Sequence, residues 1–149
     1  MGKKRVVKIA GQEVIKESKA REEALIRKLV KKGKKLEKGR IYIQASYNNT
    51  RVTVTDEKGD VITWATAGSL GFSGPKKTTP FAASKVAEVV VERIKKLGVG
   101  EVDVLVSGIG SGRTAVLKVL ASQNINIVSI KDITPIPHNG PRPKKVRRV

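Results

Sequence analysis

Two glycine-rich segments, each leading into a helix pattern, contain residue types that bind phosphate. The first segment, 68–77, is followed by Thr78-Thr79-Pro80, which is a helix start with Thr79 as N-cap and Pro80 at the first helical position. Lys76 and Lys77 add two cations beside the free backbone donors of that helix start. Because the glycines allow a backbone phosphate to approach closely, we interpret this segment as an anion site. The alternative, in which the glycines merely turn the chain, stays open.

The second segment, 108–113, also lies between a strand pattern and a helix pattern. Its Gly108-x-Gly110 spacing suggests a dinucleotide site, and Asp132 lies at about the distance of the acid that binds ribose in such sites. However, Arg113 occupies the position that needs a third small residue, so we prefer a phosphate site at the helix N-terminus. The sequence has no P-loop pattern and gives no support to NTP hydrolysis.

Other catalytic chemistries find little support in the composition. The chain has no cysteine and one histidine, His138, which excludes thiolate metal sites and cysteine nucleophiles and argues against a Ser-His-Asp hydrolase. Five acids could be imagined as a two-metal nuclease centre: Asp56, Glu57, Asp60, Asp103 and Asp132. Three of them crowd one turn, so ordinary turn and surface roles are preferred. We expect no enzyme activity, no metal and no cofactor.

The charge of the chain indicates a polyanionic partner. The 149 residues carry 31 Lys and Arg against 13 Asp and Glu, a formal net charge of +18. Residues 1–40 hold 15 basic and 5 acidic side chains, residues 133–149 hold 5 and none, and the segment between is close to neutral. Two basic arms on a near-neutral body are typical of a protein that contacts phosphates beyond its folded edge. Solubilising tails are a weaker alternative, because acidic residues serve solubility better than Lys and Arg. A membrane-surface arm is also weaker, because the N-terminal arm has only a weak apolar stripe and no aromatic anchor.

The hydrophobic pattern predicts an α/β fold with a mixed five-stranded sheet. An antiparallel meander leads into a strand–helix–strand–helix–strand order, with two main helices packed on the sheet. The expected strands are 41–45, 51–55, 61–67, 102–107 and 125–130, and the expected helices run from Pro80 to about Leu97 and from Arg113 through Leu120. The apolar strand 102–107 predicts that both sheet faces are covered, and segment 68–77 is expected to hold no regular structure. Residues 18–35 are expected to form a short helix or a solvated extension.

The last segment, from Thr134 onward, is too rich in proline for a helix or a central strand, so we expect an extended arm. Its prolines reduce the entropy lost on ordering, and its cations suit a phosphate track. Asn139 precedes Gly140, which cannot hinder attack of its own backbone nitrogen on the Asn amide, and we hypothesise isoaspartate at Asn139. Aromatic residues are scarce, so recognition is expected to rest on phosphates, sugars and shape.

Five segments carry a family resemblance: ASYNNT at 45–50, GSLGF at 68–72, KTTPFAA at 77–83, GIGSGR at 108–113 and DITPIPHNG at 132–140. In this order, they closely resemble the bacterial form of the universal small-subunit ribosomal protein S-eleven family, over about residues 39–149. The resemblance divides the chain into a basic extension (1–38), a globular RNA-binding domain (39–133) and an extended basic tail (134–149). Residues 1–38 exceed the family pattern, and Pro141 replaces the Cys that is usual in bacterial members.

The resemblance implies a structural, non-catalytic protein that bridges ribosomal RNA helices on the platform of the small subunit, near the messenger exit and the Shine-Dalgarno cleft. The implied location is the ribosome in the bacterial cytoplasm, and the implied protein partners include the ribosomal proteins numbered seven and eighteen. A nucleoid- or transcription-associated DNA-binding protein is the alternative. The expected RNA-facing residues are Ser46, Asn48, Asn49, Thr50, Gly68, Ser69, Gly71, Phe72, Gly74, Lys76, Lys77, Thr78, Thr79, Gly110, Ser111, Gly112, Arg113, His138, Asn139, Gly140, Arg142, Lys144, Lys145, Arg147 and Arg148.

Overall fold

The structure is a computed structural model that describes residues 38–142 and 144–145. The helix or extension expected at 18–35 lies outside the described residues, and so do Arg147 and Arg148 of the basic tail.

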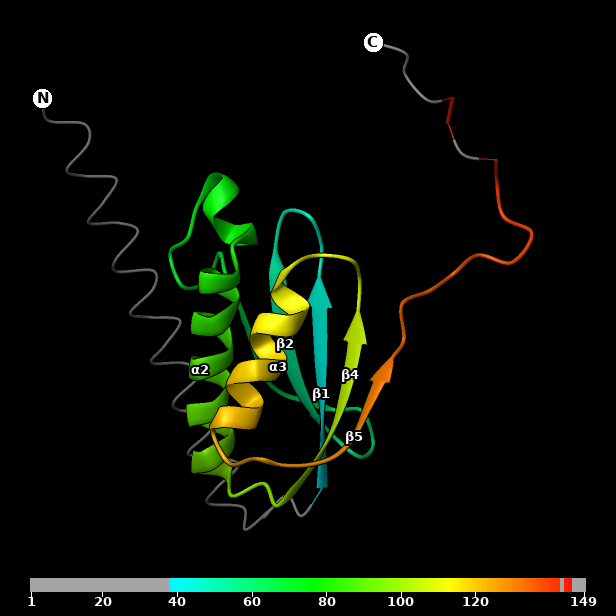
Figure 1. The fold of residues 1–149 in the computed structure, drawn as a ribbon. Coiled ribbons are helices and arrows are strands. Elements are labelled where there is room, and N and C mark those ends of the chain that lie inside the picture. Colours follow the sequence, from blue (N-terminus) through cyan, green and yellow to red (C-terminus); the bar gives the residue numbers. More distant parts are fainter. Residues whose placement is uncertain (1–37, 143, 146–149) are drawn as a thin grey trace, which may run out of the picture.

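Five strands form one mixed sheet in the order β3-β2-β1-β4-β5 (Figure 1). β1 (Lys38–Ala45) pairs antiparallel with β2 (Thr50–Asp56), and β2 pairs antiparallel with β3 (Val61–Thr66). On its other side β1 pairs in parallel with β4 (Glu101–Ser107), which pairs in parallel with β5 (Asn126–Asp132). The expected mixed five-stranded sheet is confirmed, with β1 at its centre.

Two helices, α2 (Pro80–Leu97) and α3 (Gly112–Ser122), connect the strands of the second half. The expected start of α2 is confirmed, because the Thr79 hydroxyl accepts the Ala82 N–H at 3.2 Å. Gly98 follows Leu97 as the C-cap, as expected. The expectation that segment 68–77 holds no regular structure is wrong, since a 3₁₀ helix, η1, spans Gly74–Thr78.

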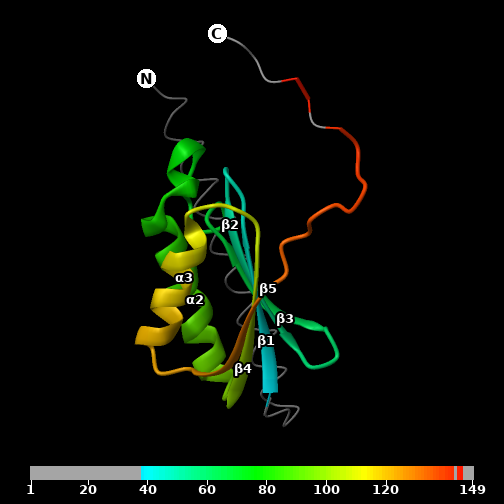
Figure 2. The same ribbon diagram turned by 45° about the vertical axis from the view of Figure 1, so that its right-hand side comes forward.

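The core fills the space between the helices and one face of the sheet. Figure 2 shows α2 and α3 together on the same side of the strands. The largest fully buried side chains come from both layers: Ile41, Ile43, Val52, Val54, Val102 and Val104 from the sheet, and Val86, Val90, Val91, Ile94, Val116 and Leu120 from the helices. No helix among the described residues is long and apolar enough to cross a membrane.

The opposite sheet face has no helical cover from the described residues, so the expectation that both faces are covered is wrong for this part of the chain. Burial alternates along β4: Val102, Val104 and Val106 are buried, whereas the residues between them are partly exposed. The crossovers β3–α2–β4 and β4–α3–β5 advance in the same direction across the sheet. Because crossovers between parallel strands are right-handed, two that advance in one direction place both helices on one face.

We predict that Ile43→Ala lowers the free energy of unfolding by about 3 kcal/mol, because it leaves a cavity in the closed core. Val61→Ala, which alters a side chain that is 60% exposed at the start of β3, should cost less than about 1 kcal/mol. Urea unfolding of the two variants measures the difference. Equal losses would contradict the assignment of the helix-covered face as the core.

Candidate nucleic-acid interface

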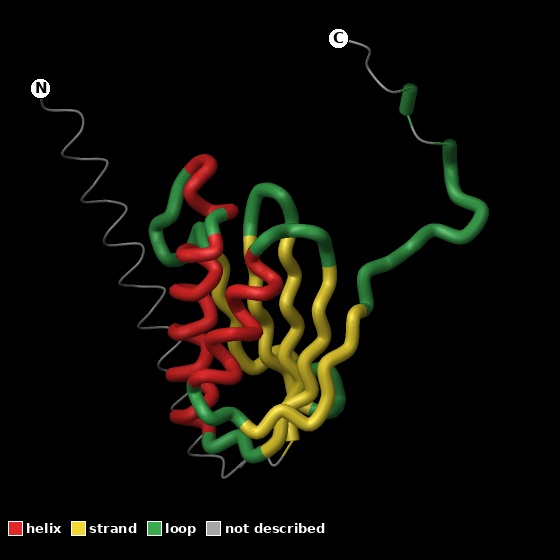
Figure 3. The backbone as a smooth tube through the Cα atoms, in the orientation of Figure 1, coloured by secondary structure: helices red, strands yellow, loops and turns green. Residues whose placement is uncertain are grey.

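The strand directions bring most of the predicted site segments to one end of the sheet. β1, β4 and β5 are parallel, and β3 runs the same way because both β1 and β3 are antiparallel to β2. The segments that follow these strands, 46–49, 67–79, 108–111 and 133–134, therefore lie together (Figure 3). We call these four segments the loop end. In open α/β sheets, ligands bind at the carboxyl ends of the strands.

The glycines of segment 108–111 let this loop pack directly on β1. The Gly110 N–H donates to the Ala45 carbonyl at 3.0 Å, and a side chain at Gly110 would collide with the Ser46 carbonyl. Gly108 has a φ of 92°, and a side chain there would collide with the Ala45 carbonyl. The structure thus uses both glycines for contact within the protein, which explains the Gly-x-Gly spacing without a dinucleotide.

Further hydrogen bonds join the other segments of the loop end. The Ser111 hydroxyl donates to the Thr78 carbonyl at 3.1 Å, which links the start of α3 to the end of η1. The Ala67 N–H donates to the Thr50 carbonyl at 3.2 Å, which links the glycine-rich segment to β2. The loop end is therefore one connected surface rather than four independent loops.

Asp132 holds the start of the tail at Thr134, and we call residues 132–134 the tail root. The Asp132 carboxylate accepts the Thr134 N–H at 2.8 Å and the Thr134 hydroxyl at 2.6 Å, and it forms an ion pair with Arg113. The Thr134 hydroxyl in turn accepts the Gly108 N–H at 3.1 Å. The bonds from Thr134, followed by that from Arg113, lower the pKa of Asp132 from 3.8 to about 2. Our sequence reasoning missed this anchor, although an Asp two residues before a hydroxyl residue is typical of an Asx turn.

Several predicted RNA-facing residues use their polar groups for hydrogen bonds within the chain. Each hydroxyl of Ser46, Ser69, Thr78 and Thr79 donates to a backbone carbonyl three residues away. The guanidinium of Arg113 donates to the Gly108 carbonyl at 2.5 Å besides its ion pair with Asp132. Pro80 has no N–H, and Thr79 takes the N–H of Ala82, so the start of α2 offers fewer free donors than the sequence suggested.

Other predicted residues keep their polar groups available. Among the described residues, Lys76 and Lys77 make no ion pair, and Asn48 is exposed on the β1–β2 turn. The side-chain oxygen of Asn49, by contrast, is buried, and it has no hydrogen-bond partner within that part of the chain. No hydrogen bond within the described part of the chain joins the tail beyond Thr134 to the domain, and Figure 1 shows this segment leading away from the sheet. The predicted tail residues within the described chain are all exposed: His138, Asn139, Gly140, Arg142, Lys144 and Lys145.

Three of the five acids considered for a nuclease centre, Asp56, Asp103 and Asp132, have structural partners. Asp56 accepts the N–H groups of Lys58 and Asp60 at 2.9 and 3.0 Å, which closes the β2–β3 turn. Asp103 accepts the Ser129 hydroxyl at 2.6 Å between β4 and β5. Within residues 38–142 and 144–145, no three His, Cys, Asp or Glu side chains gather as a metal site would require.

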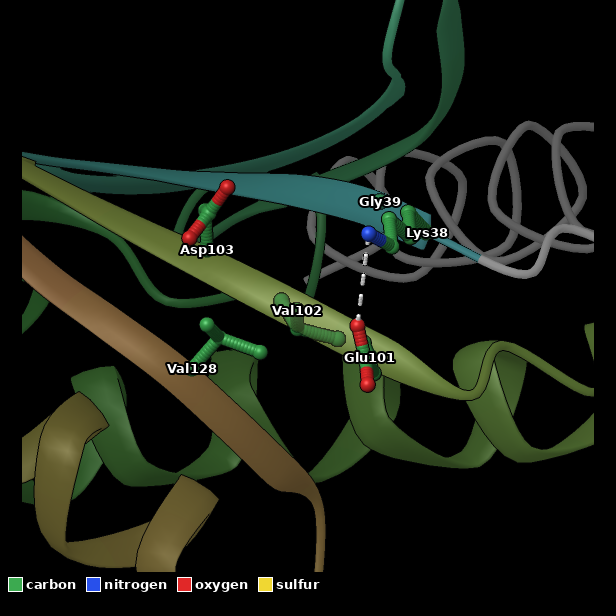
Figure 4. Close-up of a pocket in the computed structure, with 6 residues that line it drawn as sticks. All are labelled: Lys38, Gly39, Glu101, Val102, Asp103 and Val128. Atoms are coloured by element: carbon green, nitrogen blue, oxygen red, sulfur yellow. Dashed lines mark ion pairs between the residues drawn. The ribbon is translucent and has the colours of Figure 1, made fainter.

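A shallow hollow lies at the opposite end of the sheet from the loop end (Figure 4). An ion pair of 3.7 Å between Lys38 Nζ and Glu101 Oε2 crosses it, and Val128 supplies an apolar wall. None of the predicted RNA-facing residues lines this hollow, so the candidate interface is the loop end together with the tail.

These features define a basic α/β protein with its polar loops and an exposed cationic tail at one end of the sheet. A sequence model of the family "Ribosomal protein S11" matches residues 39–148. The chain belongs to this family and is thus a structural, non-enzymatic component of the small ribosomal subunit, with ribosomal RNA and small-subunit proteins as partners. A cytoplasmic location, where bacterial ribosomes work, follows from this membership.

Three bacterial relatives, each named small ribosomal subunit protein uS11, illustrate the similarity. The protein of Treponema pallidum (strain Nichols) is 50% identical over 119 residues, which cover 80% of this chain and 94% of the relative. The protein of Helicobacter pylori (strain 26695) is 52% identical over 124 residues, 83% of this chain and 93% of the relative. That of a Nitratiruptor species is 54% identical over 124 residues, with 83% and 94% covered.

We predict that the tail root holds at neutral pH and loosens in acid. Because folding lowers the pKa of Asp132, its carboxylate stabilises the root above pH 3.8, and the effect is lost as the pH falls toward 2. Asp132→Ala, which removes the accepting oxygen, should release the Thr134 amide, measured as faster hydrogen exchange at pH 7, with a difference from wild type that shrinks in acid. Glu92→Gln, an exposed change on α2, is the control. Unchanged exchange in Asp132→Ala would contradict the anchor.

Proposed function

We propose that the loop end and the tail bind separate helices of small-subunit ribosomal RNA and hold them together. Two observations on the described chain support this proposal together. Lys76 and Lys77 make no ion pair and lie on a connected loop end. The cationic tail is exposed, and beyond Thr134 it makes no hydrogen bond to the domain. Such a tail reaches phosphates that lie beyond the folded body. Each phosphate that is neutralised releases counterions, which supplies the binding free energy.

The residues assigned to this interface fall into two groups according to the structure. Direct phosphate contact is assigned to the available cations, Lys76, Lys77, Arg142, Lys144 and Lys145, with Arg147 and Arg148 extending the track beyond the described residues. Shaping of the RNA-facing surface is assigned to the glycines and to the internally bonded hydroxyl residues, together with Arg113. Asn48 presents its amide group on the exposed β1–β2 turn of the loop end, and Asn49 is assigned to shaping of this turn.

The place of the protein in the subunit is proposed from the family resemblance. The expected position is the platform, near the messenger exit and the cleft that holds the Shine-Dalgarno duplex. The proposed neighbours are the ribosomal proteins numbered seven and eighteen. The division into a basic extension (1–38), a globular domain (39–133) and a tail (134–149) belongs to this proposal, with the extension as a second arm toward RNA.

We predict that Lys76→Ala/Lys77→Ala and deletion of residues 138–149 each weaken binding to a small-subunit ribosomal RNA transcript and reduce its salt dependence. Loss of two phosphate contacts should lower the slope of log K against log salt by about 1.5. The matched control is Lys95→Ala/Lys96→Ala, a lysine pair at the far end of α2. Filter binding at several KCl concentrations measures all variants.

Competition with duplex DNA separates the proposal from the alternative of a DNA-binding protein. The ribosomal transcript should compete far better than a DNA duplex of equal charge, because folded RNA presents shaped helices and 2′-hydroxyl groups. Equal competition by DNA, or an unchanged salt slope after tail deletion, would overturn the proposal.

Asn139 is proposed as a site of isoaspartate formation. It is exposed and has a φ of 54°, and it precedes Gly140 in a turn where Gly140 packs close to Pro137. We predict that peptide mapping of protein from assembled subunits finds isoaspartate at this position and that Gly140→Ala, which crowds Pro137, slows its appearance. Intact asparagine in all assembled particles would disprove the assignment.

A further inference from the structure

The only phenylalanine ring that stands largely in solvent within the described residues lies at the loop end. Phe81 occupies the first turn of α2 and is 63% exposed. The two residues after it, Ala82 and Ala83, are fully buried, so the backbone beneath the ring is fixed on the core. The ring itself contributes little to that core, and its exposed face is open to a partner outside the chain.

A second aromatic residue holds the ring in place. Phe72, which packs against the core from the glycine-rich segment, meets Phe81 with ring centres 6.2 Å apart and ring planes at 83°. This edge-to-face arrangement is favourable for aromatic pairs. A ring that already packs against a neighbour loses less conformational entropy when a planar ligand stacks on it than a ring without contacts.

One cation lies near the ring, and two more lie in the neighbouring element η1. The Lys85 ammonium lies 5.9 Å from its centre, at the outer limit of a cation–π contact, and forms an ion pair of 2.7 Å with Glu88. Lys76 and Lys77 lie in η1, which Figure 1 shows directly beyond the start of α2. The flexible Lys85 side chain can leave the ring face when a flat ligand arrives. An exposed aromatic face among lysines suits a nucleotide, whose base stacks while its phosphate meets a cation.

We propose that Phe81 is a base-stacking position, on which an unpaired nucleobase of the ribosomal RNA lies while Lys76 and Lys77 contact neighbouring phosphates. This inference rests on the proposed RNA binding and adds that the bound element includes at least one unstacked nucleotide. Bases inside a helix already stack on one another, so an exposed ring gains most from a base that is turned out of a loop or bulge.

The test compares Phe81→Leu with the wild-type full chain in binding to a small-subunit ribosomal RNA transcript. Leu keeps the helix propensity and an apolar side chain but removes the aromatic face, and urea unfolding of the variant measures the stability lost with the Phe72 contact. Loss of one stacked base should weaken binding about tenfold. The slope of log K against log salt should stay unchanged, because stacking releases no counterions, whereas Lys76→Ala/Lys77→Ala lowers it. Phe81→Tyr should bind as the wild type does, and Val61→Ala is the control for an exposed apolar side chain far from the loop end.

A spectroscopic variant gives an independent readout. The chain has a single tryptophan, Trp64, on β3. In Trp64→Phe/Phe81→Trp the only indole therefore stands at the stacking position, and its emission should be quenched on saturation with the transcript. Wild-type affinity in Phe81→Leu, or unquenched emission at saturation, would overturn the stacking position while leaving RNA binding intact. A wild-type chain that does not bind the transcript would overturn both proposals.

Discussion

The backbone contact between the β4–α3 loop and the end of β1 is the constraint on which the rest of the interface depends. Gly108 and Gly110 meet the carbonyls of Ala45 and Ser46 so closely that a side chain at either position would collide with them. This contact places the Gly108 N–H where Thr134 can accept it, and Thr134 in turn joins Asp132. The start of α3 and the root of the tail are thereby held at one end of the sheet. Without that contact the cations would sit on unconnected loops.

The side chains that form the core are different from the cationic side chains assigned to RNA binding. The core is built from aliphatic side chains of the helices and one sheet face, and no charged residue of the described chain is buried in it. The excess positive charge lies in the arms and at the loop end, where mutual repulsion of the lysines does not act on the core. Such a division suits a structural component of the small ribosomal subunit, in which a rigid body sets the directions in which basic segments reach RNA.

Much of the fold could be predicted because its signals are local. The alternation of Ile41 and Ile43, the Thr79-Pro80 helix start and the stop at Gly98 each depend on near neighbours in the chain, and all three were confirmed. The prediction of two covered sheet faces was wrong for the described residues, because the apolar residues of β4 are compatible with either arrangement and the direction of the crossovers decides it. The 3₁₀ helix η1 was missed, because glycine spacing outweighed the local effect of Pro75.

The sequence by itself determined the class of protein: a near-neutral α/β body with basic arms, no thiol chemistry and the motifs of a ribosomal family. Composition and short motifs are properties of the chain, so they need no coordinates. Only the tertiary structure decided which polar groups remain available to a partner. Arg113 pairs with Asp132, the hydroxyls of Thr78 and Thr79 close their own turns, and Lys76 and Lys77 stay free of ion pairs within the described chain. Hydrogen bonding depends on distance in space, and residues far apart in sequence meet only after folding.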